Sequence, residues 1–270
     1  MKTQVAIIGG GPAGMLLSEM LHRAGIACVV LERQTEEHVR SRIRAGVLEP
    51  GTVELLRQLG LAERLDREGH AHDGMQVAWA GREQFMIDIH QTLGKRFVAY
   101  PQTKIQEDLL AVAKARGAVV LNAVQDVQLH EVAGERPFVT FGHAGESVRL
   151  DCDFIAGCDG FHGVSRRAIP PDVLREFEKV YPFGWLGVLS QTPPLPDIVY
   201  ANNPRGFALA SMRNPSLSRY YIQVPVDARI EDWPDDRFWS ELKARFPQAM
   251  GDAIVTGPAI EESVAPLRSY

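Results

Sequence analysis

The sequence predicts a mixed α/β (α+β) protein, in which a parallel-sheet region precedes a region of antiparallel strands. Three observations carry this prediction. Near the N-terminus, short apolar runs flank an amphipathic helical pattern. Residues 75–89 have the pattern of two strands that turn near Gly81, and residues 183–226 are strand-like, aromatic and punctuated by glycines. A helix over residues 235–245 is expected to pack against the antiparallel sheet.

The N-terminal motif predicts the ligand class. An apolar run leads directly into Gly9-x-Gly11-x-x-Gly14, and a second apolar run ends at Glu32. Gly9 permits a sharp turn, Gly11 lets the backbone approach a pyrophosphate, and Gly14 lets the helix pack closely on the strand. The helix N-terminus offers N–H groups to the anion, and Glu32 would accept hydrogen bonds from a ribose. This order predicts a Rossmann-like dinucleotide site, and the alternative is a glycine turn that only packs.

The composition and charge of the chain narrow the class of protein further. The chain has 270 residues and a net charge of -5, which gives no general reason to expect nucleic-acid binding. Its apolar stretches are shorter than the ~20 residues that span a bilayer, so we expect a cytoplasmic protein without a membrane partner. The odd cysteine count, without Cys-x-x-Cys spacing, predicts free thiols and no metal site.

The remaining pattern gives a domain prediction. A helix is expected from about residue 104 to 115 with Thr103 as its N-cap, and short strands near 119–124, 138–141 and 148–150. We expect residues 1–180 to form a discontinuous nucleotide domain with inserted strands at about 75–100, and residues 181–266 to form the antiparallel-sheet domain. Residues 267–270 are expected to begin a strand that returns to the first domain, so the sequence looks C-terminally truncated.

A second motif follows the apolar segment 154–157. Asp159-Gly160 stands at a predicted strand end, where the carboxylate can hold a ligand hydroxyl or a water. Alone, Asp-Gly is an ordinary turn. With the N-terminal motif it resembles the class A flavoprotein aromatic hydroxylases, although broader members of the class place Ser where Gly163 stands.

The resemblance is closest to the 4-hydroxybenzoate 3-monooxygenase family and extends over nearly the whole chain. The matching segments are 31–35, 42–49, 155–163, 181–187 and 265–269. The family's later Gly-Asp motif and its C-terminal helices with a second active-site tyrosine are absent. The resemblance implies a Rossmann-like FAD-binding domain and an antiparallel-sheet substrate domain.

A predicted hairpin suggests an anion site independently of the family. Strands 207–213 and 219–224 would be joined by a five-residue loop, which places Arg213 opposite Arg219 and Ser211 opposite Tyr221 on one face. Opposed guanidiniums repel, so this face favours an anion, and an arginine fork with hydroxyl groups suits a carboxylate. A solvated face with scattered charges is the alternative, and a bulge would change the register.

The resemblance assigns roles to individual residues. It implies that Ser211, Arg213 and Tyr221 bind the substrate carboxylate, that Tyr200 contacts the phenol, and that His72 is the outer end of a proton relay. It further implies cofactor contacts for residues outside the glycine motif, namely Glu32, Arg33, Gln34, Arg42, Arg44, Gln102, Asp159, His162, Arg219 and Arg268.

The resemblance also implies the reaction. We expect an FAD-dependent monooxygenase that uses NADPH, or NADH, and O2 to convert 4-hydroxybenzoate to 3,4-dihydroxybenzoate, with a homodimer as its assembly. The familiar NADPH users of the family have Tyr where His38 stands. Two alternatives remain: a hydroxylase of a related hydroxybenzoate or aminobenzoate, and a catalytically incomplete fragment that binds only nucleotide.

Overall fold

The computed structural model describes residues 1–41, 46–80 and 83–269, and its internal contacts divide the chain into two compact units. Unit 1 contains residues 1–45, 59–61 and 101–175, and unit 2 contains residues 46–58, 62–100 and 176–270. The division differs from the expected one chiefly in residues 62–100, which it groups with the antiparallel sheet. Each unit is described by itself.

Unit 1 is built on a four-stranded parallel sheet with the order β12-β1-β2-β8. Its strands are β1 (Val5–Ile8), β2 (Cys28–Leu31), β8 (Val119–Leu121) and β12 (Phe154–Gly157). Helix α1 (Pro12–Arg23) joins β1 to β2, and these two strands pair in parallel. The strand, glycine turn, helix and strand predicted from the N-terminal pattern are therefore confirmed.

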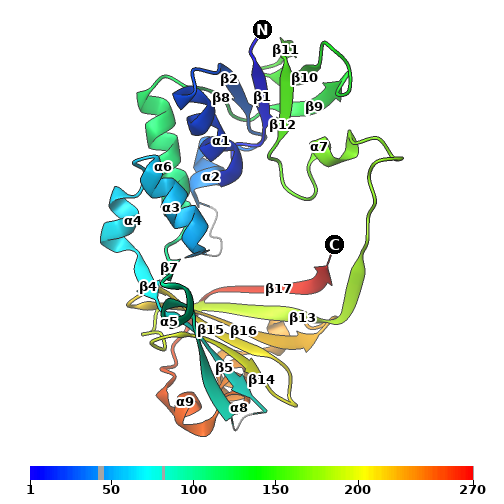
Figure 1. The fold of residues 1–270 in the computed structure, drawn as a ribbon. Helices are drawn as coiled ribbons and strands as arrows, with labels where there is room; N and C mark the ends of the chain where they lie inside the picture. The colour runs from blue at the N-terminus through cyan, green and yellow to red at the C-terminus, as the bar shows by residue number, and fades with distance from the viewer. Residues whose placement is uncertain (42–45, 81–82, 270) are drawn as a thin grey trace. The chain divides into compact units, whose positions relative to one another are not determined.

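Helices cover one side of this sheet and a smaller sheet covers the other. Helix α6 (Gln102–Ala115) packs beside α1 (Figure 1). The other side carries the antiparallel strands β9 (Gln125–His130), β10 (Phe138–His143) and β11 (Glu146–Asp151). Alternate residues of β1 and β2, such as Ala6 and Leu31, share one apolar core with Phe141 and Leu150 of that sheet. This burial fixes which face of the parallel sheet the helices occupy.

Local details of unit 1 differ from the sequence prediction. Helix α6 begins at Gln102, after Pro101, and no side chain caps it, so the predicted N-cap role of Thr103 is wrong. Strand β9 was not predicted. The two shorter helices of the unit are α2 (Glu36–Ser41) and α7 (Val164–Arg167).

Unit 2 is built on a seven-stranded sheet with the order β17-β13-β16-β15-β14-β5-β6. Neighbouring strands are antiparallel except for β14 and β5, which are parallel. The strands are β5 (Gly74–Trp79), β6 (Glu83–Asp88), β13 (Lys179–Ser190), β14 (Ile198–Asn202), β15 (Ala208–Asn214), β16 (Leu217–Pro225) and β17 (Ala259–Ser269). The expected strand pair over residues 75–89 is present as β5 and β6.

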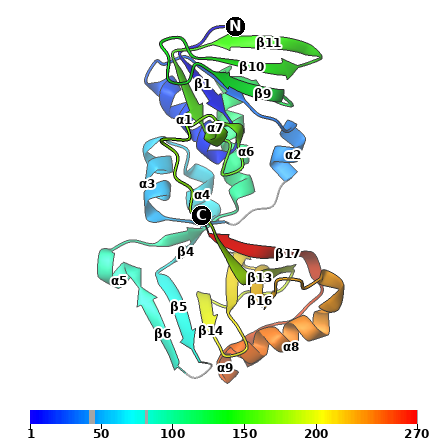
Figure 2. The same cartoon turned by 90° about the vertical axis from the view of Figure 1, so that its right-hand side faces the viewer.

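Helices α8 (Asp235–Arg245) and α9 (Gln248–Ala253) lie against one face of this sheet (Figure 2). The helix predicted over residues 235–245 is confirmed. Its Phe238 and Leu242 are fully buried against sheet residues such as Val188, Ala210 and Ile222. A short 3-10 helix, Ile230–Asp232, precedes α8. The opposite face of the sheet carries a different set of side chains.

The rest of unit 2 is small. A three-stranded sheet contains β3 (Val47–Leu48), β7 (Phe97–Ala99) and β4 (His70–His72), and the accompanying helices are α3 (Pro50–Gln58), α4 (Glu63–Glu68) and α5 (Ile89–Leu93). Residues 267–269 continue β17 beside β13, so they do not begin a strand of unit 1 as the sequence suggested. Among the described residues, no helix has the length and apolar character needed to cross a membrane.

Candidate functional site

The glycine turn after β1 depends on residues that have no side chain. Gly9 has φ +104°, and its N–H donates to the Leu31 carbonyl at 2.8 Å. A Cβ at Gly9 would collide with the Cys158 carbonyl oxygen, and a Cβ at Gly14 would collide with the Gly9 carbonyl oxygen. Only glycine therefore allows this turn and the close start of α1.

Gly11 serves a different purpose. A Cβ at Gly11 would meet no described atom within 4 Å, although this residue is the N-cap of the 12-residue helix α1. The space beside the Gly11 backbone is therefore open, and the first N–H groups of the helix follow directly in the chain. These N–H groups carry partial positive charge, so the turn fits a phosphate group of a dinucleotide.

Backbone N–H groups fix the carboxylate of Glu32. One oxygen accepts from Gly10 N and the other from Gln34 N, each at 2.8 Å. The carboxylate is thereby held beside the glycine turn, where a ribose would lie. Sequence reasoning missed Gln106, which is buried on α6 and donates to the Gly10 carbonyl at 2.7 Å. Only its place on the inner face of that helix could have indicated this contact.

The side chain of Asp159 stabilises the turn of the second motif. Its Oδ2 accepts from Ser165 N at 3.0 Å, at the start of α7. A Cβ at Gly163 would collide with the Asp159 carboxylate, which explains in physical terms why glycine stands here. One carboxylate oxygen therefore organises the turn, and a ligand role for Asp159 stays a prediction.

The other predicted cofactor residues are scattered in the structure. Arg33 is exposed, Gln102 is the first residue of α6, and the His162 ring lies edge-on to Phe161 with centroids 5.0 Å apart. Arg268 forms an ion pair with Glu178 at 2.9 Å. Arg42 and Arg44 lie outside the described residues.

The second candidate region is the sheet face of unit 2 that faces away from α8. Because side chains alternate along strands, residues in register across the sheet share a face. One row contains Tyr200, Leu209, Tyr221, Gly187 and Ser263, and the next row contains Ser211, Arg219, Leu189 and Glu261. We call this side the polar face, defined by Tyr200, Ser211, Arg213, Arg219, Tyr221, Glu261 and Ser263.

The predicted hairpin register is wrong by two residues. Ser211 pairs with Arg219, and Leu209 pairs with Tyr221, where the sequence suggested Arg213 opposite Arg219. The loop is shorter than expected because β15 extends to Asn214, whose side chain accepts from Ser216 N at 2.9 Å. A bulge between Met212 and Asn214 shifts the pairing by one residue, and the shorter loop accounts for the other. A two-residue shift keeps the same face, so the predicted residues still lie together.

The two arginines of the polar face differ in their partners. Arg219 donates to Glu261 Oε1 at 2.7 Å and to Ser263 Oγ at 3.2 Å. Arg213 is 8% exposed, and among the described residues its Nε has no hydrogen-bond partner. Burial lowers the pKa of Arg213, Tyr221 raises it, Arg219 lowers it, and Glu261 raises it. Arg213 is thus a buried cation to which no acidic side chain of the described residues is hydrogen-bonded.

Smaller groups complete the polar face. The Ser211 hydroxyl donates to the Arg219 carbonyl at 3.1 Å, and the Arg219 guanidinium lies 5.0 Å from the centre of the Tyr221 ring. A Cβ at Gly187 would lie 2.6 Å from Tyr221 Cε1, so glycine leaves room for this ring. Sequence reasoning missed Gly187, Glu261 and Ser263, because their contacts depend on the pairing of β13 with β16 and β17.

Tyr200 and His72 occupy separate environments in unit 2. The half-buried Tyr200 ring packs on Phe207 with centroids 5.9 Å apart. His72 is 2% exposed, and within the described part of the chain its Nε2 has no hydrogen-bond partner. Burial lowers the pKa of His72, His70 lowers it further, and Asp197 and Asp73 oppose this shift. No hydrogen bond joins Tyr200 to His72 among the described residues.

These features define a class: an α/β protein with a dinucleotide turn and, in its other unit, a sheet face that carries two buried arginines. Comparison with known proteins makes the class specific. The model of an FAD binding domain family matches residues 2–270. The p-hydroxybenzoate hydroxylase of Acinetobacter baylyi is 47% identical over 100% of this chain and 67% of its own length. The chain therefore belongs to the family of FAD-dependent aromatic monooxygenases, and FAD is its cofactor.

More distant relatives share shorter regions or only the fold. The 6-methylpretetramide 4-monooxygenase of Streptomyces rimosus is 29% identical over 66% of this chain, which spans 43% of that protein's length. The crystal structure of PqsL from Pseudomonas aeruginosa with 2-aminobenzoylacetate superposes with a TM-score of 0.81 at 18% identity, over 99% of this chain and 74% of that one. The latter likeness shows the fold alone.

Proposed function

We propose that this protein is the 4-hydroxybenzoate-hydroxylating member of its family, and that it converts 4-hydroxybenzoate to 3,4-dihydroxybenzoate with NADPH and O2. The observation that carries the substrate assignment is the buried guanidinium of Arg213, which has no acidic partner within hydrogen-bond distance among the described residues. A buried charge is costly unless a counter-ion meets it. A substrate carboxylate supplies that counter-ion.

The polar face gives the carboxylate its orientation. The planar fork of Arg213 offers parallel N–H groups to both carboxylate oxygens. The Tyr221 hydroxyl supplies a further donor on the same face, and the Ser211 hydroxyl would donate to the carboxylate by rotating away from the Arg219 carbonyl. With its carboxylate held there, a flat aromatic acid has its distal end fixed relative to the sheet.

The distal phenol needs a different partner. Ring hydroxylation by an electrophilic oxygen is faster when the phenol is ionised, because phenolate donates electron density to the ring. The Tyr200 hydroxyl would hydrogen-bond this oxygen and accept or pass on its proton. His72, whose Nε2 is unpaired in the described part of the protein, would exchange that proton outward as neutral imidazole.

The glycine turn and Glu32 would hold the adenosine half of FAD, with the turn at its phosphates and Glu32 at its ribose. FAD supplies the activation of O2 and the transfer of one oxygen atom to the ring. The resemblance to the family supports further FAD contacts from Arg33, Gln34, Arg42, Arg44, Gln102, Asp159, His162, Arg219 and Arg268, and supports a homodimer.

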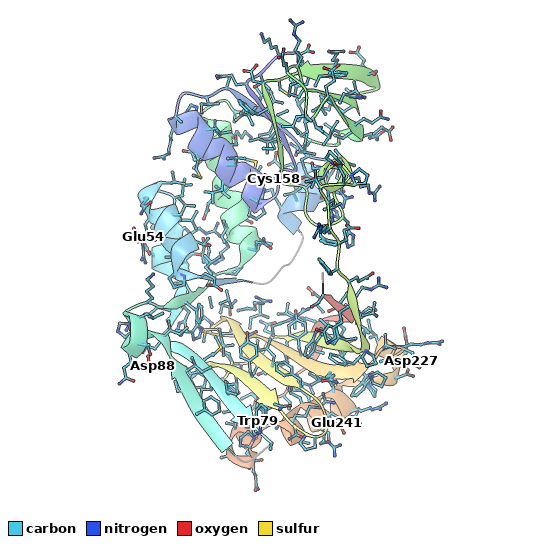
Figure 3. The ribbon with its side chains drawn as sticks, turned by 45° about the vertical axis from the view of Figure 1, so that its right-hand side comes forward. Glu54, Trp79, Asp88, Cys158, Asp227 and Glu241 are labelled. Atoms are coloured by element: carbon cyan, nitrogen blue, oxygen red, sulfur yellow. The ribbon has the colours of Figure 1, made fainter. Side chains whose placement is uncertain are left out.

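The test is the substrate affinity of the FAD-loaded Arg213→Gln variant. Loss of a charge-assisted contact should raise the dissociation constant for 4-hydroxybenzoate about tenfold to hundredfold, which is roughly 1.5–3 kcal/mol. Arg205→Gln is the matched control, because Arg205 is exposed and paired with Glu241 on α8 (Figure 3). Calorimetric titration measures both, and unchanged affinity in Arg213→Gln overturns the assignment.

Product analysis with related acids separates the alternatives. The expected outcome is coupled hydroxylation of 4-hydroxybenzoate at the position ortho to its hydroxyl. Faster coupled turnover of 3-hydroxybenzoate or 4-aminobenzoate would replace the proposed substrate. NADPH consumption without product for all three acids would favour a protein that only binds nucleotide.

A further inference from the structure

We propose that Glu261 is a specificity-determining residue that sets the charge of the substrate site by neutralising Arg219, so that the site accepts one carboxylate group and discriminates against dicarboxylates. This inference rests on the proposed function, because it concerns the same polar face. Its basis is the unequal pairing of the two arginines.

Glu261 forms its hydrogen bond with Arg219, while toward Arg213 it exerts only a longer-range attraction. Its Oε1 accepts from Arg219 Nη1 at 2.7 Å, and the side chains involved are 34% and 7% exposed. Ser263, two residues further along β17, accepts from the second terminal nitrogen of Arg219 at 3.2 Å. The two contacts fix both ends of the guanidinium fork, so Arg219 has a defined position and a nearby counter-charge.

Because Glu261 pairs with Arg219, the charge of Arg219 is compensated by a direct ion pair and the charge of Arg213 is not. Without Glu261, two buried guanidiniums on one sheet face would present two positive charges to the ligand. With Glu261 ionised, the three side chains sum to one positive charge, which matches one carboxylate. Electrostatic interactions at partly buried sites are screened weakly, so this sum affects ligand choice directly.

The site then discriminates against a dianion, because the carboxylate of Glu261 repels a second carboxylate of the ligand. A second carboxylate on the ring would meet a site whose second guanidinium is already occupied by Glu261. Binding specificity often arises from such unfavourable elements as well as from attractive contacts. Removing the charge of Glu261 therefore favours a dianion more than a monoanion, since the electrostatic gain scales with ligand charge.

The experiment uses the FAD-loaded, full-length protein and calorimetric titration at about pH 8, where carboxyl groups are ionised. The ligands are 4-hydroxybenzoate and 4-hydroxyphthalate, which carries a second carboxylate. Glu261→Gln keeps an oxygen that accepts from Arg219 and removes only the charge. We expect the affinity ratio of 4-hydroxyphthalate over 4-hydroxybenzoate to rise about threefold to tenfold, the size expected for one charge several ångströms away.

Two further variants distinguish the effect of the charge of Glu261 from the effect of the position of Arg219. Glu262→Gln removes the same charge from the neighbouring residue, which pairs with Val188 and faces the α8 side of the sheet, so the ratio should stay at its wild-type value. Ser263→Ala frees one end of Arg219 without changing any charge. A ratio shift in Ser263→Ala equal to that in Glu261→Gln would overturn the charge argument.

The outcomes also separate this inference from the proposed function. If the wild-type protein binds 4-hydroxybenzoate and the ratio is unchanged in Glu261→Gln, only the role of Glu261 is overturned. If the wild-type protein binds neither acid, the proposed substrate is overturned, and the inference with it.

Discussion

The glycine turn after β1 and the polar face of unit 2 use opposite means to prepare for a ligand. At the turn, Gly9 and Gly14 are required because any side chain would collide with backbone carbonyls. On the polar face, charged and hydroxyl side chains such as Arg213 and Ser211 are brought together by strand register. As proposed, the first region would bind through backbone N–H groups and the second through side chains, so different substitutions should damage each.

The largest expected effect is at Gly14. Alanine in a helix is favoured over glycine by about 1 kcal/mol, yet a Cβ here collides with the Gly9 carbonyl. The collision should prevail and reduce the free energy of unfolding of Gly14→Ala by about 3 kcal/mol, the upper end of overpacking costs. Chemical denaturation of the flavin-free protein measures this.

Gly11→Ala is the matched control, because its Cβ meets no described atom within 4 Å. The free energy of unfolding without flavin should fall by only about 0.5–1 kcal/mol, because alanine is a poorer N-cap residue than glycine. FAD retention should fall, since the added methyl group occupies the space proposed for the phosphates. Equal losses of stability in both variants would contradict the distinct roles assigned to these glycines.

On the polar face, Tyr200→Phe should act on chemistry and leave affinity nearly intact. Without the hydroxyl, the pKa of the bound phenol should rise and hydroxylation should slow about hundredfold, as is typical of a lost proton-transfer partner. Spectral titration of bound 4-hydroxybenzoate and rapid-mixing kinetics measure the two effects. An unshifted phenol pKa would remove Tyr200 from the proposed relay.

Gly187 tests whether the polar face also depends on a missing side chain. A Cβ would lie 2.6 Å from Tyr221 Cε1 and 3.1 Å from Arg219 Nη2. Because the ends of side chains can shift, Gly187→Ala should fold, while the dissociation constant for 4-hydroxybenzoate rises about tenfold, or 1.4 kcal/mol. A variant that unfolds would show that this glycine resembles Gly14 in its role.

The smallest effect concerns His72. Burial lowers its pKa in the folded state, so between that value and about 6.5 the unfolded chain binds more protons, and stability falls as pH falls through this window. The groups that act on it are His70, Asp73 and Asp197. His72→Asn should therefore flatten the dependence of the unfolding free energy on pH in this window, as chemical denaturation at a series of pH values would measure.

Sequence predicted those parts of both regions that depend on local spacing. The turn at Gly9 and helix α8 follow from periodicity within a few residues. The predicted register of β15 and β16 was wrong because the loop is shorter than expected and a bulge after Met212 shifts the pairing by one more residue, and no local pattern marks the bulge. Glu261 could not be predicted for the polar face, because its position depends on the pairing of β17 with β13. Strand β9 was missed because its sequence is mostly polar.

The parallel pairing of β5 with β14 has a consequence for synthesis of the chain. Gln76 on β5 and its hydrogen-bond partner Asp197 are 121 positions apart. At about 5–20 residues per second, the ribosome needs roughly 6–24 seconds to deliver β14 after β5 has emerged. During that delay the β5–β6 hairpin, with Trp79 at its outer end (Figure 3), has an unsatisfied strand edge. The nascent protein is therefore expected to need chaperone protection at this hairpin until β14 arrives.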